Sequence, residues 1–156
     1  MNIFVLDPNP KVAAVMLCDK HTVKMILESA QMLSTVAYKN GYEPKYRPTH
    51  NKHPCTLWVG ESKSNWQWLV THSLEMCSEY TRRYGRVHKS QGIIQWCIDN
   101  NTGPQSDLGQ TPFRLAMPHQ YKTKDPVESY RNYYIGEKAG FAKWKLGPPG
   151  WWTERL

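Results

Sequence analysis

Four polar side chains suited to acid–base chemistry, those of His21, Lys24, Glu28 and Gln31, recur three or four residues apart within Asp19–Tyr38. In a helix, this spacing places all four within roughly 80° of arc on one side. An imidazole, an amine, a carboxylate and an amide on one face can move protons or stabilise a developing charge. The same spacing also fits a solvent-exposed face with an ion pair between Lys24 and Glu28. We predict that the row faces a pocket, with Glu28 and His21 at its centre.

Histidine and cysteine side chains offer a second kind of chemistry. Cys18 and His21 form a C-x-x-H pair, and His50, His53 and Cys55 follow close together. These are zinc-ligand types, but neither group has the spacing of a zinc finger. We therefore predict no metal and no cofactor, with His50 and His53 contacting phosphate or backbone from a loop. The four cysteines lack paired spacing, and we expect free thiols without disulfides.

Basic and aromatic residues are mixed at several places in a chain whose formal net charge is +7 and whose pI is about 9.3. Arg and Lys bind phosphates and Tyr can stack on exposed bases, so DNA or a nucleotide is the expected partner. The alternative is ordinary packing, with Tyr rings inside and Arg side chains outside. The residues predicted to contact nucleic acid are Gln31, Lys45, Arg47, His50, His53, Arg82, Arg83, Arg86, Tyr130, Arg131 and Tyr134.

The elements that must position these residues are helices, and we predict a single all-α domain over residues 1–156, with four or five helices, long loops and little or no strand. The apolar face of the first long helix is expected to be Val23, Ile26, Leu27, Ala30, Leu33 and Ala37. The expected helices are one or two turns in Lys11–Cys18, then Asp19–Tyr38, Trp58–Tyr84, Gln91–Asn100 and Val127–Gly140. Residues 2–6 are expected to be extended or a small strand, and 42–55 and 101–123 to be loops.

Location is predicted from hydropathy. No apolar run approaches the ~18–20 residues of a membrane span, and the first residues lack the basic start of a signal peptide. We expect a cytoplasmic protein with no membrane partner, in the host cytoplasm if it is encoded by a phage.

Several motifs together resemble a known family. Glu28 follows Asp19-x-His21 by seven residues, and a Lys52-His53-Pro54 loop, the run EYTRRYG and the cluster YRNYY come later in the chain. This order is similar to that of the phage pyrimidine-dimer DNA glycosylase/AP lyase of the endonuclease V type. The opening MNIFVLD and the stretch CDKHTVKM also look like a group of uncharacterised bacteriophage proteins.

The resemblance implies a reaction at an amine beside a glutamate. In that family the α-amine of the second residue forms an imine with the sugar of a damaged nucleotide, and the strand is cut by elimination. Glu28 matches the glutamate and His21 a histidine next to the site. Position 2 is Asn2, a residue that usually leaves Met1 in place, so the candidate amines are those of Met1, Asn2 and Lys24.

The leading hypothesis is therefore excision of a modified or damaged pyrimidine by a glycosylase/lyase-like enzyme. Two alternatives stay open on the sequence alone. One is a non-catalytic phage protein that binds or sequesters a nucleotide or nucleic acid. The other is a transferase that modifies DNA bases on the same scaffold.

Overall fold

The computed structural model describes residues 1–155, and this part of the chain is all-α, as predicted, with seven α-helices and no strand. The helices are α1 (Pro10–Met16), α2 (Asp19–Lys39), α3 (Pro54–Glu61), α4 (Lys63–Tyr84), α5 (Gln91–Asp99), α6 (Pro126–Tyr133) and α7 (Gly150–Glu154). A 3₁₀ turn, η1 (His119–Tyr121), precedes α6, and a π-helical turn, η2 (Tyr134–Lys138), follows it. None of these helices is both long and apolar enough to cross a membrane.

The helix count exceeds the four or five expected because the segment Trp58–Tyr84 is not one helix and because the short helix α7 was not expected. Ser62 has an extended backbone, with φ −151° and ψ 158°, and separates α3 from α4. Its hydroxyl accepts a hydrogen bond from the Asn65 N–H at 3.1 Å, as an N-cap residue does. The sequence offers Ser62 as a candidate cap, but the separate helix α3 ahead of it was not predicted, because residues 54 and 55 were assigned to the preceding loop and 58–61 to the same helix as α4.

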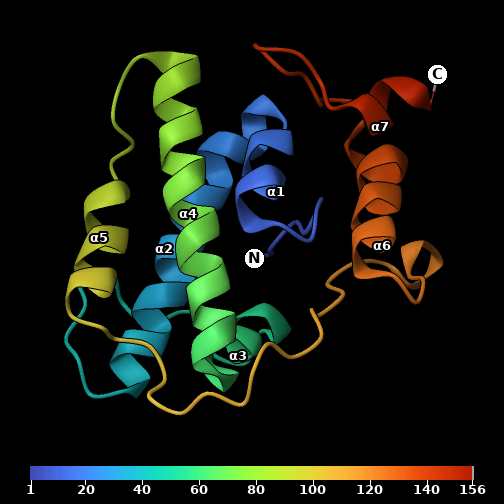
Figure 1. Ribbon diagram of the computed structural model, residues 1–156. Helices are drawn as coiled ribbons and strands as arrows, with labels where there is room; N and C mark the ends of the chain where they lie inside the picture. Colours follow the sequence, from blue (N-terminus) through green and yellow to red (C-terminus); the bar gives the residue numbers. More distant parts are fainter. Residues whose placement is uncertain (156) are drawn as a thin grey trace.

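The two long helices α2 and α4 form the centre of the molecule (Figure 1). Helices α1, α3 and α5 pack around them, and α6 and α7 stand on the side opposite α5 (Figure 1). Helix α1 is tied to α4 by two buried rings, since Trp68 donates to the Pro8 carbonyl and His72 Nδ1 lies 2.9 Å from the Pro10 carbonyl. Helix α6 packs against the first residues of the chain, where Arg131 donates to the Leu6 carbonyl and Tyr130 contacts Phe4.

The buried face of α2 is not the predicted one. Ile26, Ala30, Leu33 and Ala37 are buried as expected, but Val23 and Leu27 are 42% and 40% exposed. The core instead receives a neighbouring set, which also contains polar side chains. This set is His21, Thr22, Met25, Glu28, Ser29, Met32, Ser34, Thr35 and Val36.

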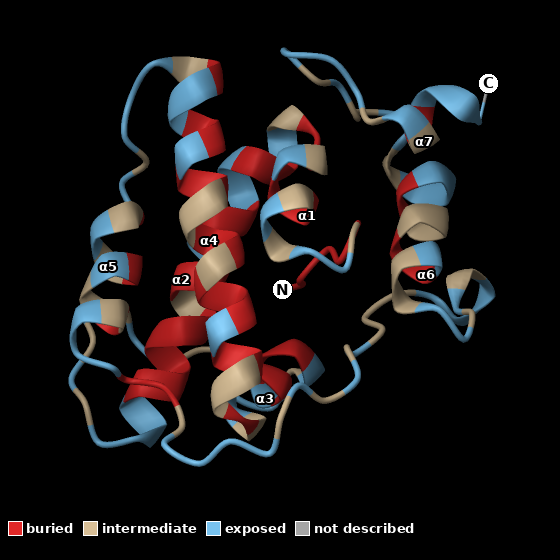
Figure 2. Cartoon of the chain, viewed as in Figure 1, coloured by how far each residue is buried: buried red, intermediate tan, exposed pale blue. Residues whose placement is uncertain are grey.

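The N-terminal segment, residues 2–6, explains why the buried face of α2 differs from the predicted one. All five residues are buried and none of them is in a strand, and Figure 2 shows the segment in red ahead of α1. Phe4 stacks on His21 of α2 at 4.4 Å between ring centroids and meets Tyr130 of α6 edge-on. The segment therefore covers the polar side of α2, which a helix facing water would leave exposed.

The loop over residues 101–123 lies against the core. Thr102 and Gly103 are buried, and a Cβ on Gly103 would lie 2.4 Å from the Trp66 ring. Asn65 binds Thr111 in both directions, donating to its hydroxyl and accepting from its N–H. This glycine contact and these hydrogen bonds explain how so long a loop stays ordered without helix or strand of its own.

Candidate functional site

The structure brings the first residues of the chain onto the carboxylate of Glu28. Glu28 is 7% exposed, and its Oε1 lies 3.1 Å from the amino nitrogen of Met1. The same oxygen accepts the backbone N–H of Asn2 at 3.0 Å. An amine and a carboxylate in this arrangement can exchange a proton directly, which nucleophilic catalysis by an amine requires.

The Asn2 side chain anchors this part of the chain. Its Nδ2 donates to the Ala116 carbonyl at 2.8 Å, and its Oδ1 accepts the Ile3 N–H at 2.8 Å. The Tyr130 hydroxyl and the Cys55 thiol also lie against Oδ1, at 3.1 and 3.8 Å. With all its polar atoms engaged, the Asn2 side chain fixes the position of its own backbone nitrogen beside Glu28.

Lys24 reaches Glu28 from the solvent side. Its Nζ lies 4.0 Å from Glu28 Oε2, and its side chain is 65% exposed. Lys24, one of the three candidate amines, is therefore not desolvated as a buried nucleophilic amine would be, because an exposed ammonium keeps its hydration. The two oxygens of Glu28 thus face different neighbours, with Oε1 toward the chain terminus and Oε2 toward Lys24.

His21 is a packing residue. Besides stacking on Phe4, its Nδ1 lies 2.6 Å from the Tyr134 hydroxyl. Burial, followed by the positive charges of three nearby lysines with Lys138 foremost, lowers the pKa of His21 from 6.5 to about 3. The ring is therefore neutral at physiological pH. Its contact with Phe4 does hold the N-terminal segment in place.

The predicted row therefore does not face a single open pocket. His21 and Glu28 are buried under the N-terminal segment, Gln31 is half-buried and Lys24 is exposed. What covers the row is the chain's own beginning, a contact that helical periodicity within α2 cannot reveal.

His53 lies close enough to the N-terminal amine for its pKa to be affected by the charge of that amine. Its Nδ1 accepts the Cys55 N–H at 3.1 Å and caps α3. Burial, then the positive charges of the N-terminal amine and of His50, lower its pKa, while the charge of Glu28 raises it. Because Nδ1 is an acceptor, a neutral His53 carries its proton on Nε2, which is then available as a donor.

Two tyrosines predicted to contact nucleic acid are unavailable. Tyr130 and Tyr134 are both fully buried. Burial raises the pKa of each phenol above its ordinary value, and each hydroxyl is used inside the protein. The prediction that they stack on bases is wrong, because Tyr130 of α6 and Tyr134 of η2 both pack against Phe4 of the N-terminal segment.

Arg83 was also misassigned. It is buried, and its Nε donates to Glu79 at 2.9 Å, while its Nη1 donates to Asp19 at 3.0 Å. Its guanidinium further donates to the carbonyls of Leu17 and Val15, which end α1. The group joins three helices, and four of its five N–H donors are used inside the protein, so this buried side chain does not present its charge to a phosphate.

The remaining basic residues differ in exposure. Arg82 and Arg86 are exposed near the end of α4, where Arg82 pairs with Glu79 and Arg86 donates to the Tyr80 hydroxyl at 2.9 Å. Arg131 is half-buried, donates to the Leu6 carbonyl at 2.9 Å and lies over the Trp151 ring. Lys45, Arg47 and His50 are exposed on the loop after α2. Contact of these groups with nucleic acid stays a prediction.

The proposed zinc ligands do not assemble. Cys18 lies against the Tyr134 hydroxyl at 3.6 Å, whereas Cys55 lies against Asn2. Burial raises the pKa of the Cys55 thiol to about 11, which keeps it protonated. Within residues 1–155, no three or more His, Cys, Asp or Glu side chains are grouped so that they could hold a metal ion.

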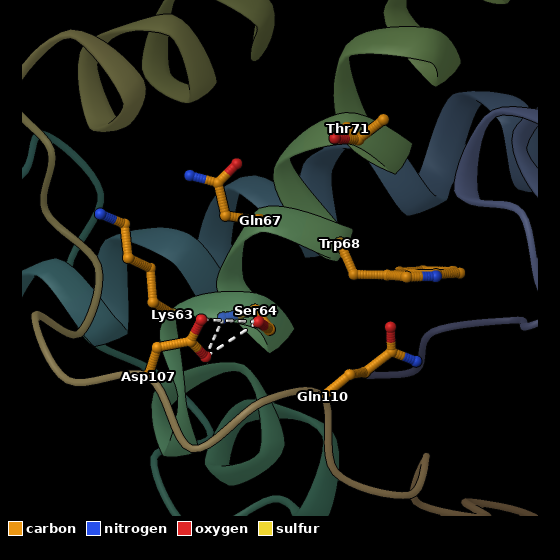
Figure 3. Close-up of a pocket in the computed structure, with 7 residues that line it drawn as sticks. All are labelled: Lys63, Ser64, Gln67, Trp68, Thr71, Asp107 and Gln110. Atoms are coloured by element: carbon orange, nitrogen blue, oxygen red, sulfur yellow. Dashed lines mark hydrogen bonds between the residues drawn. The ribbon is translucent and has the colours of Figure 1, made fainter.

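A surface hollow of about 420 Å³ lies at the start of α4, and none of its lining residues takes part in the Met1–Glu28 contacts. It is lined by Lys63, Ser64, Gln67, Trp68, Thr71, Asp107 and Gln110. Asp107 accepts from both the backbone N–H and the hydroxyl of Ser64, which fixes the loop to α4 (Figure 3). The Asp107 carboxylate is therefore already bonded within the protein, and the other lining side chains point in different directions in Figure 3. We do not assign a ligand to this hollow.

Comparison with known proteins gave one match. Residues 1–91 match the family model described as pyrimidine dimer DNA glycosylase. Searches of curated proteins and of solved structures found no match. The matched part contains Met1, Glu28 and His53 and covers more than half of the chain. On this evidence, the chain belongs to the pyrimidine dimer DNA glycosylase family.

Proposed function

We propose that this protein excises a damaged or modified pyrimidine from DNA and cuts the strand at the resulting abasic sugar. The observation that carries the proposal is the 3.1 Å contact between the Met1 amine and Glu28 Oε1. An amine held against a buried carboxylate at the start of the chain is the arrangement that imine chemistry needs.

The identity of the first residue does not decide whether an amine is present. The nitrogens of Met1 and Asn2 both lie beside Glu28 Oε1, at 3.1 and 3.0 Å. If Met1 were removed, the Asn2 nitrogen, which already lies 3.0 Å from Glu28 Oε1, would become the free amine. Asparagine at position 2 is therefore compatible with either processed form.

The reaction would proceed by attack of the amine on the sugar, loss of the base and elimination of the 3′ phosphate. Glu28 accepts a proton from the ammonium, and the freed amine lone pair attacks C1′ of the deoxyribose. The C1′–N bond to the base breaks and the base leaves with the electron pair, and the proton that the attacking nitrogen loses on forming its bond to C1′ neutralises the departing base. The sugar ring then opens as the nitrogen lone pair forms the C=N bond and O4′ takes a proton. Loss of a proton from C2′ expels the 3′ phosphate, and water hydrolyses the imine and restores the amine.

His53 has the properties of a phosphate or sugar donor in this scheme. Its Nδ1 is held by the Cys55 N–H, which leaves the Nε2 proton to donate. The positive charge of the N-terminal amine lowers the pKa of His53, so the ring lies within its electrostatic reach. A neutral donor at this position can bind substrate without repelling the ammonium.

The test is trapping of the imine with borohydride on a duplex that contains one abasic site. We expect a covalent adduct whose DNA maps to the N-terminal peptide. Lys24→Ala should keep the adduct on that peptide, whereas an N-terminal extension of one or more residues should abolish it. An adduct on the Lys24 peptide would overturn the assignment of the amine, and duplex retention with neither adduct nor cleavage would overturn the enzymatic proposal.

Glu28→Gln tests the carboxylate separately. It keeps the size of the side chain and removes its charge, so proton transfer should fail while duplex binding persists. We expect cleavage to fall by about a hundredfold or more, with affinity unchanged or slightly tighter. A melting curve checks that the variant is folded, and full activity in a folded Glu28→Gln protein would end the catalytic assignment.

A further inference from the structure

A second hollow of about 320 Å³ lies between the loop after α2 and the start of α5. It is lined by Glu43, Lys45, Lys89, Gly92, Ile93 and Trp96, none of which takes part in the Met1–Glu28 contacts. A hydrogen bond of 2.9 Å between the hydroxyls of Tyr46 and Ser90 joins the two walls. Its volume is at the lower end of small-molecule sites, about 300–1,000 Å³.

The hollow has positive charge on both walls. Lys45 comes from the loop and Lys89 from the residues before α5. Among the carboxylates of residues 1–155, none forms an ion pair within 4.0 Å of either ammonium nitrogen. Two like charges on one small hollow, without a partner from the protein, favour an anionic ligand.

The rest of the lining favours a flat, partly apolar ligand. Ile93 and Trp96 are half-buried and present an aliphatic and an aromatic surface to the hollow. Such a surface accepts the face of a ring. Glu43 adds a carboxylate, which accepts hydrogen bonds from an amino group and repels phosphate. The ligand must therefore carry its anionic group and its amino group at different ends.

We propose that this hollow binds a nucleoside monophosphate whose base has an exocyclic amino group. The phosphate lies between Lys45 and Lys89, the base lies on Ile93 and Trp96, and the amino group donates to Glu43. The same chemistry is offered by a free nucleotide and by a nucleotide unit of a DNA strand. The proposal does not depend on lyase activity at Met1 and Glu28.

Gly92 provides a sharp test, because it can be used to fill the hollow without damaging the fold. It has an ordinary helical backbone, and a Cβ at this position would meet nothing within 4 Å. Equilibrium dialysis of the full chain with labelled dAMP, dCMP, dTMP and orthophosphate is the measurement. We expect dAMP and dCMP to bind more tightly than dTMP, and all three to bind more tightly than orthophosphate.

The variants separate the parts of the site. Gly92→Leu should abolish binding with no loss of melting temperature, whereas Gly92→Ala should bind nearly as the wild type. Lys45→Gln and Lys89→Gln should each weaken binding by about tenfold, the usual size of a lost charged contact. Lys11→Gln, which removes an exposed lysine on α1, is the matched control.

Competition identifies the source of the nucleotide. If a DNA strand supplies it, an oligonucleotide displaces labelled dAMP and Gly92→Leu weakens duplex binding; if not, dAMP stays bound. Glu28→Gln should bind dAMP unchanged, so failure of the lyase proposal would leave this one standing. Absence of nucleotide binding at millimolar concentration, or equal binding by the Gly92→Leu protein, would overturn it.

Discussion

Two buried histidines should make this protein lose stability in mild acid. His72 is fully enclosed, stacked on Trp68, and its Nδ1 lies 2.9 Å from the Pro10 carbonyl. Burial lowers the pKa of His72 to about 4 and that of His21 to about 3, from an ordinary value of 6.5. Below pH 6.5 the unfolded chain binds a proton on each ring, while the folded chain does not. The free energy of unfolding therefore falls as the pH drops from about 6.5 toward 4.

The expected loss is large compared with the stability of a protein of this size. Each ring contributes about 1.4 kcal/mol for every pH unit in this range. At pH 5 the loss is about 2 kcal/mol per ring and about 4 kcal/mol for the pair. The free energy of unfolding of a globular domain is about 5–15 kcal/mol, so a loss of this size should clearly lower the midpoint of a denaturant titration.

The assay is urea unfolding at pH 7 and pH 5, followed by circular dichroism. His72→Gln keeps a donor for the Pro10 carbonyl and should remove about half of the difference between the two pH values. His119→Gln, which removes an exposed imidazole, is the control and should leave the difference in place. A wild-type unfolding free energy that is equal at pH 7 and pH 5 would refute the argument.

Three further outcomes follow from particular contacts. Arg83→Met should lower the unfolding free energy by roughly 3–5 kcal/mol, because it leaves buried carbonyl and carboxylate groups unpaired; Arg82→Met, at an exposed neighbour, should cost less than about 1 kcal/mol in the same denaturant titration. Gly103→Ala should cost roughly 1–3 kcal/mol through its clash with Trp66, whereas Gly92→Ala should cost nothing measurable by melting temperature. Duplex affinity should fall steeply between ~50 and ~200 mM salt in a filter-binding assay, and a flat response would argue against phosphate contacts.

The sequence predicted helix ends well where a capping residue, a proline or a glycine marks them. Pro10 begins α1 after the cap Asn9, and Gly85 ends α4 in the left-handed region at φ 68°. Helix α2 begins at Asp19 and ends one residue beyond the prediction. The short helix α7 was missed, since five residues are too few for a periodic pattern.

The candidate site was predicted in part. The spacing within α2 and the family resemblance both selected Glu28, and the structure places the chain's first nitrogens on its carboxylate. Exposure within the same row was not predictable, because periodicity gives the angle around a helix axis but not which neighbour covers it. For the same reason, the exposure of Val23 and Leu27 was not predicted, since their residue types favour burial.

The contacts that position the amine lie partly outside the segment that matches the family. Glu28 and His53 fall within residues 1–91, but the groups that hold the Asn2 side chain include the Ala116 carbonyl and the Tyr130 hydroxyl. These partners are 114 and 128 residues away in sequence. The aromatic residues near the end of the chain, first interpreted as a base-stacking surface, instead fix the backbone from which the proposed nucleophile projects. In the proposed reaction, a buried tyrosine would therefore act by holding an asparagine, without touching DNA.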